Sequence, residues 1–239
     1  MQKKLSIIVP VYNEAAFVIR SLENVVNVEI PNWKKEIIII NDGSTDDTLR
    51  LLREFNKKHK LIKIISYAQN LGKGAALKKG IRVAQGEITI IQDGDLEYDP
   101  NDYFPILKKY ENKNTKVVYG SRILGTKIYH NHSASRLFLL GGLTLTQLMN
   151  LMFNTKITDQ PTCYKSWRSS LSQKMLKNCQ SNGFEFEIEM TAYFAQANEI
   201  QEVPIHYYPR TVNYGKKIGL KDFFKSAWYI FLCWFKYRV

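Results

Sequence analysis

Residues 88–95 read Ile-Thr-Ile-Ile-Gln-Asp-Gly-Asp, a short apolar run that ends in two carboxylates separated by one glycine. The run at residues 88–92 is rich in isoleucine and short for a helix, so it predicts a strand. Because it is apolar on both faces, it is typical of a strand in a sheet that is covered on both sides. Asp93 and Asp95 then follow the carboxyl end of that strand.

The same alternation extends through the first half of the chain. Further Ile- and Val-rich runs predict strands at residues 5–11, 36–40, 61–66 and 116–119. Segments of helical length and period separate them, at residues 14–27, 46–57, 73–84 and 100–110. Gly86 fits a helix stop, and Pro100 fits a first helical position. Strands that alternate with helices indicate the α/β class, with a mostly parallel sheet and helices on both faces.

The pattern changes after Gly120. Long helices are predicted at residues 133–153, 185–196 and 220–237, and an extended piece at residues 202–208. No linker or repeat interrupts the sequence, so we expect residues 1–239 to form a single domain. Residues 1–120 would form its first half, and residues 121–239 a second half that ends in an amphipathic helix.

The composition limits the classes of protein to which this chain can belong. The 239 residues hold 34 Lys and Arg against 22 Asp and Glu, a formal net charge of +12, which predicts an anionic partner. The cysteines, Cys163, Cys179 and Cys233, are odd in number and widely spaced, which is typical of a reducing cytoplasm and not of a disulfide framework. No apolar run reaches the length of a membrane span, and the first residues lack a cleavage site, so we expect neither a span nor a signal peptide.

Small polar clusters follow each predicted strand of the first half. They lie at residues 10–14, 41–44, 70–74, 93–95 and 120–122. Asn, Asp and Gly are also turn residues, so any one cluster on its own is more simply a turn. In an open parallel sheet, however, ligands bind outside the carboxyl ends of the strands. The five clusters together therefore predict one composite binding site.

The pair Asp93 and Asp95 is the sharpest of these clusters. Two carboxylates at a strand end can approach a hard divalent cation that also binds substrate phosphates, and Glu97 can add a third oxygen. Gly94 permits close backbone approach. The alternative is a polar turn before the helix at Pro100, although Asp99 suits that capping role better.

Residues 72–74, Gly-Lys-Gly, open a predicted helix whose free N–H groups suit an anion. The spacing is not that of a Walker A loop, and no G-x-G-x-x-G follows the first strand. The sequence therefore predicts phosphate binding by a scheme other than that of the P-loop or Rossmann dehydrogenase proteins.

Taken together, these motifs resemble the family 2 glycosyltransferases with the Rossmann-like GT-A fold. Later segments are similar to the dolichyl-phosphate mannose synthase branch, the polyprenyl-phosphate hexosyltransferases. The family is indicated by residues 10–14, 41–44, 70–74 and 93–95, and the branch by residues 120–122, 159–165, 183–187 and 203–210. The resemblance extends from Leu5 to about Lys217.

The resemblance implies a role for particular residues in binding a nucleotide-sugar. Pro10, Tyr12 and Glu14 match positions that hold the ribose and base, and Asp42 matches a carboxylate that contacts the base. The segment Asp93, Gly94 and Asp95 matches the D-x-D motif, which bridges to the diphosphate through Mg²⁺ or Mn²⁺, with Glu97 at the position of a further metal ligand. Arg210 and Lys216 match a basic segment that closes over the donor diphosphate.

The acceptor is expected to bind to the second half of the chain. Arg122 matches a basic residue at the acceptor phosphate, with Arg136 a weaker candidate. A lipid phosphate is already an anionic nucleophile and needs positioning more than a base. A hydroxyl acceptor on a glycan or lipid would need a general base, for which Asp159 is the candidate. Both acceptor classes remain open, and for Asp159 so does a role in shaping its loop.

The last predicted helix carries an aromatic stripe, and residues 204–239 hold seven Lys or Arg against one Asp. Such a helix can simply pack in a core, or it can lie in a membrane interface. We expect peripheral contact with the cytoplasmic face of a membrane. Despite the positive charge, we expect no nucleic-acid binding, because no recognition motif is present and the acidic clusters lie at the ligand edge of the sheet.

Overall fold

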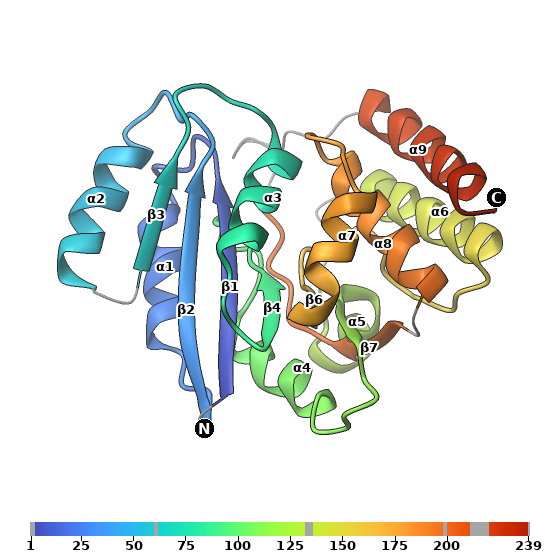
Figure 1. Cartoon of the computed structure of the whole chain (residues 1–239), viewed down its shortest axis with the longest axis horizontal. Helices are drawn as coiled ribbons and strands as arrows, with labels where there is room; N and C mark the ends of the chain where they lie inside the picture. Colours follow the sequence, from blue (N-terminus) through green and yellow to red (C-terminus); the bar gives the residue numbers. More distant parts are fainter. Residues whose placement is uncertain (1–2, 60–61, 132–135, 198–199, 211–219, 239) are drawn as a thin grey trace.

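The structure is a computed structural model that describes residues 3–59, 62–131, 136–197, 200–210 and 220–238. Its centre is a seven-stranded sheet in the order β3-β2-β1-β4-β6-β5-β7 (Figure 1). The strands are β1 (Lys3–Val11), β2 (Trp33–Asn41), β3 (Ile62–Ser66), β4 (Ile88–Ile91), β5 (Val117–Ser121), β6 (Lys165–Arg168) and β7 (Ile200–Pro204). Only β6 runs against the others, which confirms the predicted mostly parallel sheet.

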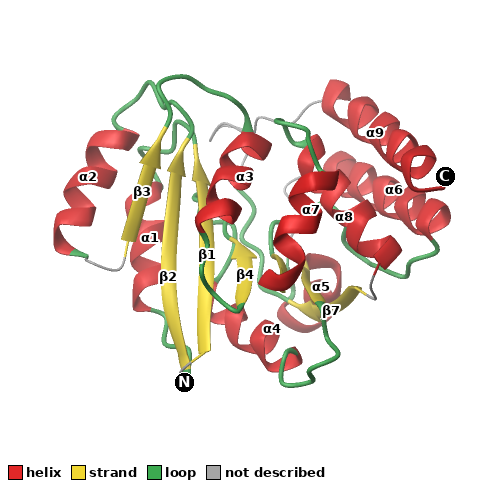
Figure 2. Ribbon diagram, viewed as in Figure 1, coloured by secondary structure: helices red, strands yellow, loops and turns green. Residues whose placement is uncertain are grey.

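Helices fill the connections between the strands, as Figure 2 shows. They are α1 (Val18–Asn27), α2 (Thr48–Lys58), α3 (Lys73–Val83), α4 (Tyr103–Lys109), α5 (Arg122–Tyr129), α6 (Arg136–Phe153), α7 (Ser172–Asn178), α8 (Glu185–Ala197) and α9 (Leu220–Arg238), with 3₁₀ turns at Pro100–Asp102 and Ser169–Leu171. Among the described residues, no helix combines the length and the apolar character needed to cross a bilayer.

The apolar strands bury both of their faces, as their sequences predict. In β2, Ile37 and Ile39 belong to the large cluster that includes α1 and α2, whereas Ile38 and Ile40 pack with Ala76 of α3 on the other face. Successive side chains of a strand point to opposite faces, so an uninterrupted isoleucine run requires a helix layer on each side. The predicted α/β architecture with helices on both faces is therefore confirmed.

Several local predictions need correction. The first helix begins at Val18 and not at residue 14, because Asn13 has φ 53° and the chain turns there before the helix starts. Gly86 is not a helix stop. Helix α3 ends before it, and the Gly86 N–H donates to Ser6 Oγ at 2.7 Å, so a close approach to β1 explains the glycine. Pro100 does open a helical turn, with Asp99 as its cap, as expected.

Strand β6 was missed because its four residues, Lys-Ser-Trp-Arg, carry none of the Ile and Val enrichment that marks the other strands. It pairs antiparallel with β4 on one side and with β5 on the other. A segment of the second half of the chain thus lies between two strands of the first half, and the two halves share one sheet.

The loop before α3 packs against the loop before α8. Gly72 has φ 99°, and a Cβ atom added there would lie 2.4 Å from the backbone oxygen of Asn182. The N–H of Ala75 donates to the same oxygen at 3.0 Å. This contact joins the two halves of the domain beside the carboxyl edge of the sheet.

We expect Gly72→Ala to lower the free energy of unfolding by about 2 kcal/mol or more, because it combines a left-handed backbone with a clash against fixed main chain. Gly141→Ala is the matched control. Gly141 lies within α6, and a Cβ atom added there would meet only the ring of Phe223 on α9, at 3.6 Å. That substitution should be neutral or stabilising by about 0.5–1 kcal/mol. Urea denaturation of both variants makes the comparison, and equal stabilities would contradict the docking of the two loops.

Candidate functional site

The candidate site lies at the carboxyl edge of the sheet. Strands β4 and β5 both run antiparallel to β6 and therefore point the same way, so the ends of β1, β2, β3, β4 and β5 meet at one edge. The five polar clusters follow these strand ends in the sequence. The topology of the sheet thus brings together polar clusters that are far apart in the sequence.

The loops after β1 and β2 are tied to each other by hydrogen bonds. The N–H of Asn13 donates to Ser44 Oγ at 3.0 Å, and the N–H of Glu14 donates to Thr48 Oγ1 at 2.9 Å. This arrangement holds the segment with Pro10, Tyr12 and Glu14 at the edge. Contacts of these three residues with a nucleotide remain a prediction.

Asp42 is almost completely buried, with 3% of its surface exposed. Its two carboxylate oxygens accept hydrogen bonds from the backbone N–H groups of Leu71 and Gly72, at 2.9 and 2.8 Å. The side chain therefore fixes the loop that leads into α3. Contact with a base stays a prediction for Asp42, while its role in holding the loop before α3 is visible.

Asp93 begins the D-x-D segment and pairs with a lysine. Lys73 Nζ lies 2.9 Å from Asp93 Oδ1 and 3.0 Å from Glu187 Oε2. Burial acts against the charged lysine, but the two carboxylates outweigh it and hold the pKa of Lys73 well above its usual range. A Cβ atom on Gly94 would lie 2.8 Å from Val11, so glycine lets this segment pack closely against the end of β1.

Arg210 lies at the centre of the remaining acidic groups. Its guanidinium is 3.0 Å from Glu14 Oε2 and 2.9 Å from Asp95 Oδ2. Its backbone N–H donates to Glu97 Oε1 at 3.0 Å, and the Tyr207 hydroxyl donates to Glu97 Oε2 at 3.1 Å. Arg210 thus joins the segment after β7 to the loops after β1 and β4.

The carboxyl group of Asp95 titrates far from its usual range. Burial comes first among the causes, followed by the charges of Asp93 and Glu97, and together they raise the pKa of Asp95 to about 7 despite the opposing Arg210. Burial and the two neighbouring carboxylates therefore outweigh the effect of Arg210 on the pKa of Asp95.

The predicted metal ligands fit a divalent cation by their chemistry. They offer carboxylate oxygens, the donors that Mg²⁺ and Mn²⁺ prefer, and an acidic environment that a cation would stabilise. In the part of the chain that the structure describes, however, no group of three or more His, Cys, Asp or Glu side chains is gathered closely enough to hold a metal. Asp93 faces Lys73, whereas Asp95 and Glu97 face Arg210. Metal binding by Asp93, Asp95 and Glu97 remains a prediction.

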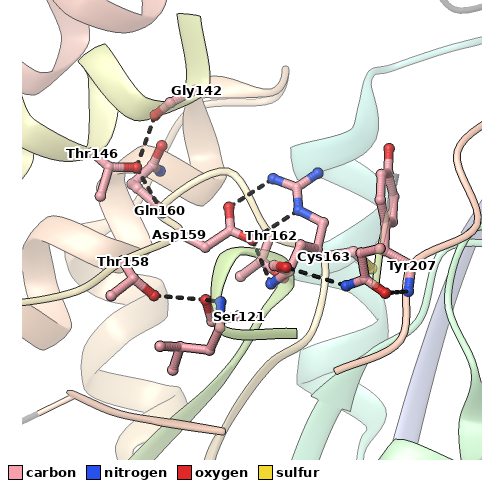
Figure 3. Close-up of polar contacts among 12 residues, drawn as sticks. Ser121, Gly142, Thr146, Thr158, Asp159, Gln160, Thr162, Cys163 and Tyr207 are labelled. Carbon is pink, nitrogen blue, oxygen red and sulfur yellow. Dashed lines mark hydrogen bonds and ion pairs between the residues drawn. The ribbon is translucent and has the colours of Figure 1, made fainter. Parts of the chain in front are cut away.

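A second buried ion pair lies at the end of β5. Arg122 donates from Nε to Asp159 Oδ2 at 2.8 Å and from Nη2 to Asp159 Oδ1 at 2.7 Å, and its backbone N–H also donates to Oδ2. Glu202 of β7 accepts from the N–H groups of Thr158 and Asp159 and fixes this loop. Figure 3 shows Asp159 between Thr158 and Gln160, with its carboxylate turned toward the guanidinium.

This geometry leaves Asp159 little freedom to accept a proton. Both of its oxygens are engaged, and 3% of its surface is exposed. Burial acts against the charge of Arg122, but Asp159 outweighs it and keeps the pKa of Arg122 well above its usual range. About one fifth of the Arg122 side chain stays exposed, so this side chain is not closed off from a ligand. A base role for Asp159 stays a prediction that the ion pair opposes.

Two candidates cannot be placed. Lys216 lies outside the described residues, and the side chain of Arg136, the first residue of α6, is also not described.

Three side chains that shape the site were not identified from the sequence: Lys73, Glu187 and Asn131. Asn131 donates to the carbonyl oxygens of Arg122 and Ile205 and so fixes the loop after α5. For Lys73, the available signal in the sequence was its position in the Gly-Lys-Gly segment.

The sequence of this chain is similar to those of known proteins. Residues 6–176 match the family described as Glycosyl transferase family 2. Dolichyl-phosphate beta-glucosyltransferase ALG5C of Trichomonas vaginalis is 28% identical over 213 residues, which cover 84% of this chain and 62% of that protein. The uncharacterized glycosyltransferase YkcC of Bacillus subtilis is 29% identical over 164 residues, covering 66% of this chain and 50% of its own. The chain thus spans only about half to three fifths of the length of these relatives.

Solved structures share the fold at low sequence identity. Glucosyl-3-phosphoglycerate synthase of Mycobacterium tuberculosis, in complex with UDP, has a TM-score of 0.67 and 14% identity over 98% of this chain and 79% of that one. Mannosyltransferase PcManGT of Pyrobaculum calidifontis, in complex with GDP-Man and Mn²⁺, has a TM-score of 0.57 and 16% identity over 85% of this chain and 55% of that one. The motifs, the fold and the match over more than half of the chain agree, and the chain belongs to glycosyltransferase family 2, with the GT-A fold.

Proposed function

We propose that the protein is a metal-dependent, inverting glycosyltransferase that moves a hexose from a UDP- or GDP-linked sugar to a polyprenyl phosphate. The observation that carries this choice of acceptor is the ion pair between Arg122 and Asp159. The best candidate for a general base is bound to an arginine through both oxygens, whereas the arginine itself remains partly exposed. This arrangement suits an anionic acceptor, and a relative named as a dolichyl-phosphate glucosyltransferase supports it.

The donor would bind across the loops after β1, β2 and β4. Pro10, Tyr12, Glu14 and Asp42 would form the nucleoside side of the site. Asp93, Gly94, Asp95 and Glu97 would face the diphosphate. Mg²⁺ or Mn²⁺ bound by the carboxylates would supply positive charge where the leaving diphosphate becomes more negative. One of the similar structures contains UDP, and another contains GDP-Man and Mn²⁺, which supports a donor of this chemical class.

Arg210 would change partners when the donor binds. In the structure its guanidinium contacts the carboxylates of Glu14 and Asp95. An incoming diphosphate offers more negative charge at the same place, and an arginine fork matches phosphate oxygens well. Arg210, and Lys216 of the following segment, would then stabilise the leaving group.

The acceptor phosphate would be held by Arg122, with Arg136 as a second candidate. The attacking oxygen already carries a negative charge at neutral pH, so the reaction needs orientation more than proton removal. Asp159 would act by fixing the direction of the Arg122 guanidinium. Transfer to a hydroxyl acceptor, with Asp159 as base, would first require this ion pair to open.

An apolar surface formed by α6 and α9 would contact the membrane that carries the lipid. The two helices lie side by side at one end of the molecule (Figure 1) and share a buried cluster that includes Leu145, Met149 and Ile230. Their outward apolar side chains are exposed: Leu137, Leu139, Leu140 and Leu151 on α6, and Phe224, Trp228, Phe231, Leu232 and Phe235 on α9. Such aromatic faces with nearby Lys and Arg suit the interface of an anionic, cytoplasmic membrane surface.

A transfer assay tests the proposed reaction. The protein would be incubated with UDP- and GDP-hexoses, Mn²⁺ or Mg²⁺, and a polyprenyl phosphate, and the lipids would be analysed by mass spectrometry. We expect a hexosyl lipid phosphate from one donor, lost on chelation of the metal and in Asp95→Ala. Metal-dependent release of nucleoside diphosphate without a modified lipid, in the presence of hydroxyl acceptors that become glycosylated, would refute the phosphate acceptor.

Asp159→Asn distinguishes positioning from base catalysis. If Asp159 only orients Arg122, the KM for the polyprenyl phosphate should rise about tenfold while kcat changes less, because one arm of the bidentate pair is lost. Arg122→Lys, which cannot form the fork, should show the same pattern. A fall in kcat of about 10²–10⁴ with an unchanged KM would instead identify Asp159 as a base.

Co-sedimentation with anionic liposomes tests the surface on α6 and α9. The triple variant Phe224→Ser, Trp228→Ser and Phe231→Ser should lose most binding while keeping the melting temperature, since all three side chains are exposed. Phe104→Ser is a matched control, because Phe104 is also about half exposed but lies on α4. Equal binding by wild type and the triple variant would exclude this surface.

A further inference from the structure

A row of alternating charges leads from the D-x-D segment into the second half of the domain. It runs from Asp93 to Lys73, from Lys73 to Glu187, and from Glu187 to Lys165. The distances between the paired charged atoms are 2.9, 3.0 and 3.5 Å. The four residues come from the loop after β4, the start of α3, the first turn of α8 and the first residue of β6. Nothing in the proposed transfer of the sugar uses the last two.

The position of Lys73 is unfavourable without these partners. It is the first residue of α3, where the positive end of the helix dipole repels a cation. Its side chain is about five-sixths buried. In the described part of the chain, the flanking carboxylates of Asp93 and Glu187 are the anionic partners that make the site favourable for an ammonium group, so Glu187 helps to determine where the Lys73 charge lies.

Glu187 has one oxygen for each lysine. Oε2 contacts Lys73, and Oε1 faces Lys165 at 3.5 Å without any hydrogen bond of its own. Lys165 is completely buried, and its ammonium donates to the carbonyl oxygen of Thr162. Burial lowers the pKa of Lys165, in spite of the charge of Glu187. Glu187 thus compensates the charge of Lys165 with one oxygen and holds Lys73 with the other.

We propose that Glu187 is a positioning residue that shares the Lys73 ammonium with Asp93, keeps it from pairing with Asp93 alone, and so links α8 to the D-x-D segment. The inference rests on the proposed function and adds a residue to its donor site. Without Glu187, Lys73 would interact with Asp93 alone and neutralise that carboxylate. The acidic edge would then attract a metal–nucleotide complex less strongly, although no metal-binding side chain had been changed.

Binding of Mn²⁺ with UDP or GDP, measured by calorimetry without any acceptor, tests the proposal. We expect Glu187→Gln to weaken binding about tenfold or more, as is common when an outer partner of a metal site is removed. Glu185→Gln is the matched control. It lies two residues earlier on α8 and pairs with Lys225 of α9, so it should bind as wild type does.

Removing both buried charges distinguishes a purely structural role of Glu187 from the proposed positioning role. The double variant Glu187→Gln with Lys165→Met leaves no buried ammonium uncompensated, and it should recover the melting temperature of the wild type. Under the proposal its affinity for Mn²⁺–nucleotide stays low. Recovery of affinity in the double variant, or normal affinity in a folded Glu187→Gln protein, would overturn the proposal.

A double-mutant cycle tests whether Glu187 acts through Lys73. The effects of Glu187→Gln and Lys73→Met on Mn²⁺–nucleotide binding should be strongly non-additive, because the two side chains are in contact. Additive effects would overturn the link. If the wild type binds Mn²⁺–nucleotide but transfers no sugar to a polyprenyl phosphate, only the proposed acceptor fails, whereas no binding by the wild type would refute the donor site and this inference together.

Discussion

Repulsion between carboxylates is the constraint on which the site depends. Parallel strands that end at one edge bring their polar loops together, and here the loops carry Glu14, Asp93, Asp95 and Glu97. Several partly buried negative charges in one place are costly unless cations accompany them. Lys73 and Arg210 meet this requirement in the structure. Under the proposed function, this site would exchange its own cations for a metal and direct Arg210 to the diphosphate that comes with the metal.

The second half of the chain contributes to both of these cation sites. Arg210 follows β7, and Lys73 of α3 contacts Glu187 of α8 as well as Asp93. Strand β6 makes the connection rigid, because it lies inside the sheet between β4 and β5. The acidic loops of the first half are therefore neutralised by groups whose positions are set by the second half.

The Arg122 and Asp159 pair follows the same logic at the neighbouring strand end. The carboxylate is buried and doubly bound, and Glu202 holds the loop on which it lies. An arginine fixed in this way presents a defined direction to an anion without losing side-chain freedom on binding. The bidentate ion pair, which opposes proton transfer to Asp159, is the same feature that gives the arginine its direction.

Much of the fold was predictable from local patterns. Residues 5–11 and 88–91 lie in strands because isoleucine and valine runs bury both faces, and the polar clusters after them mark the ligand edge. Strand β6 was not predictable, since its Lys-Ser-Trp-Arg sequence has no strand pattern and forms only because β4 and β5 flank it.

The candidate site divides in the same way. The order of the motifs along the chain indicates which acidic and glycine residues gather at the edge of the sheet, because these residues follow strands in a regular order. Which cation meets which carboxylate could be read from the folded arrangement alone. Arg210 and Glu14 are 196 residues apart, and a lysine or arginine carries no local signal of its partner, because the pairing depends on distances through space that the order of strands in the sheet creates.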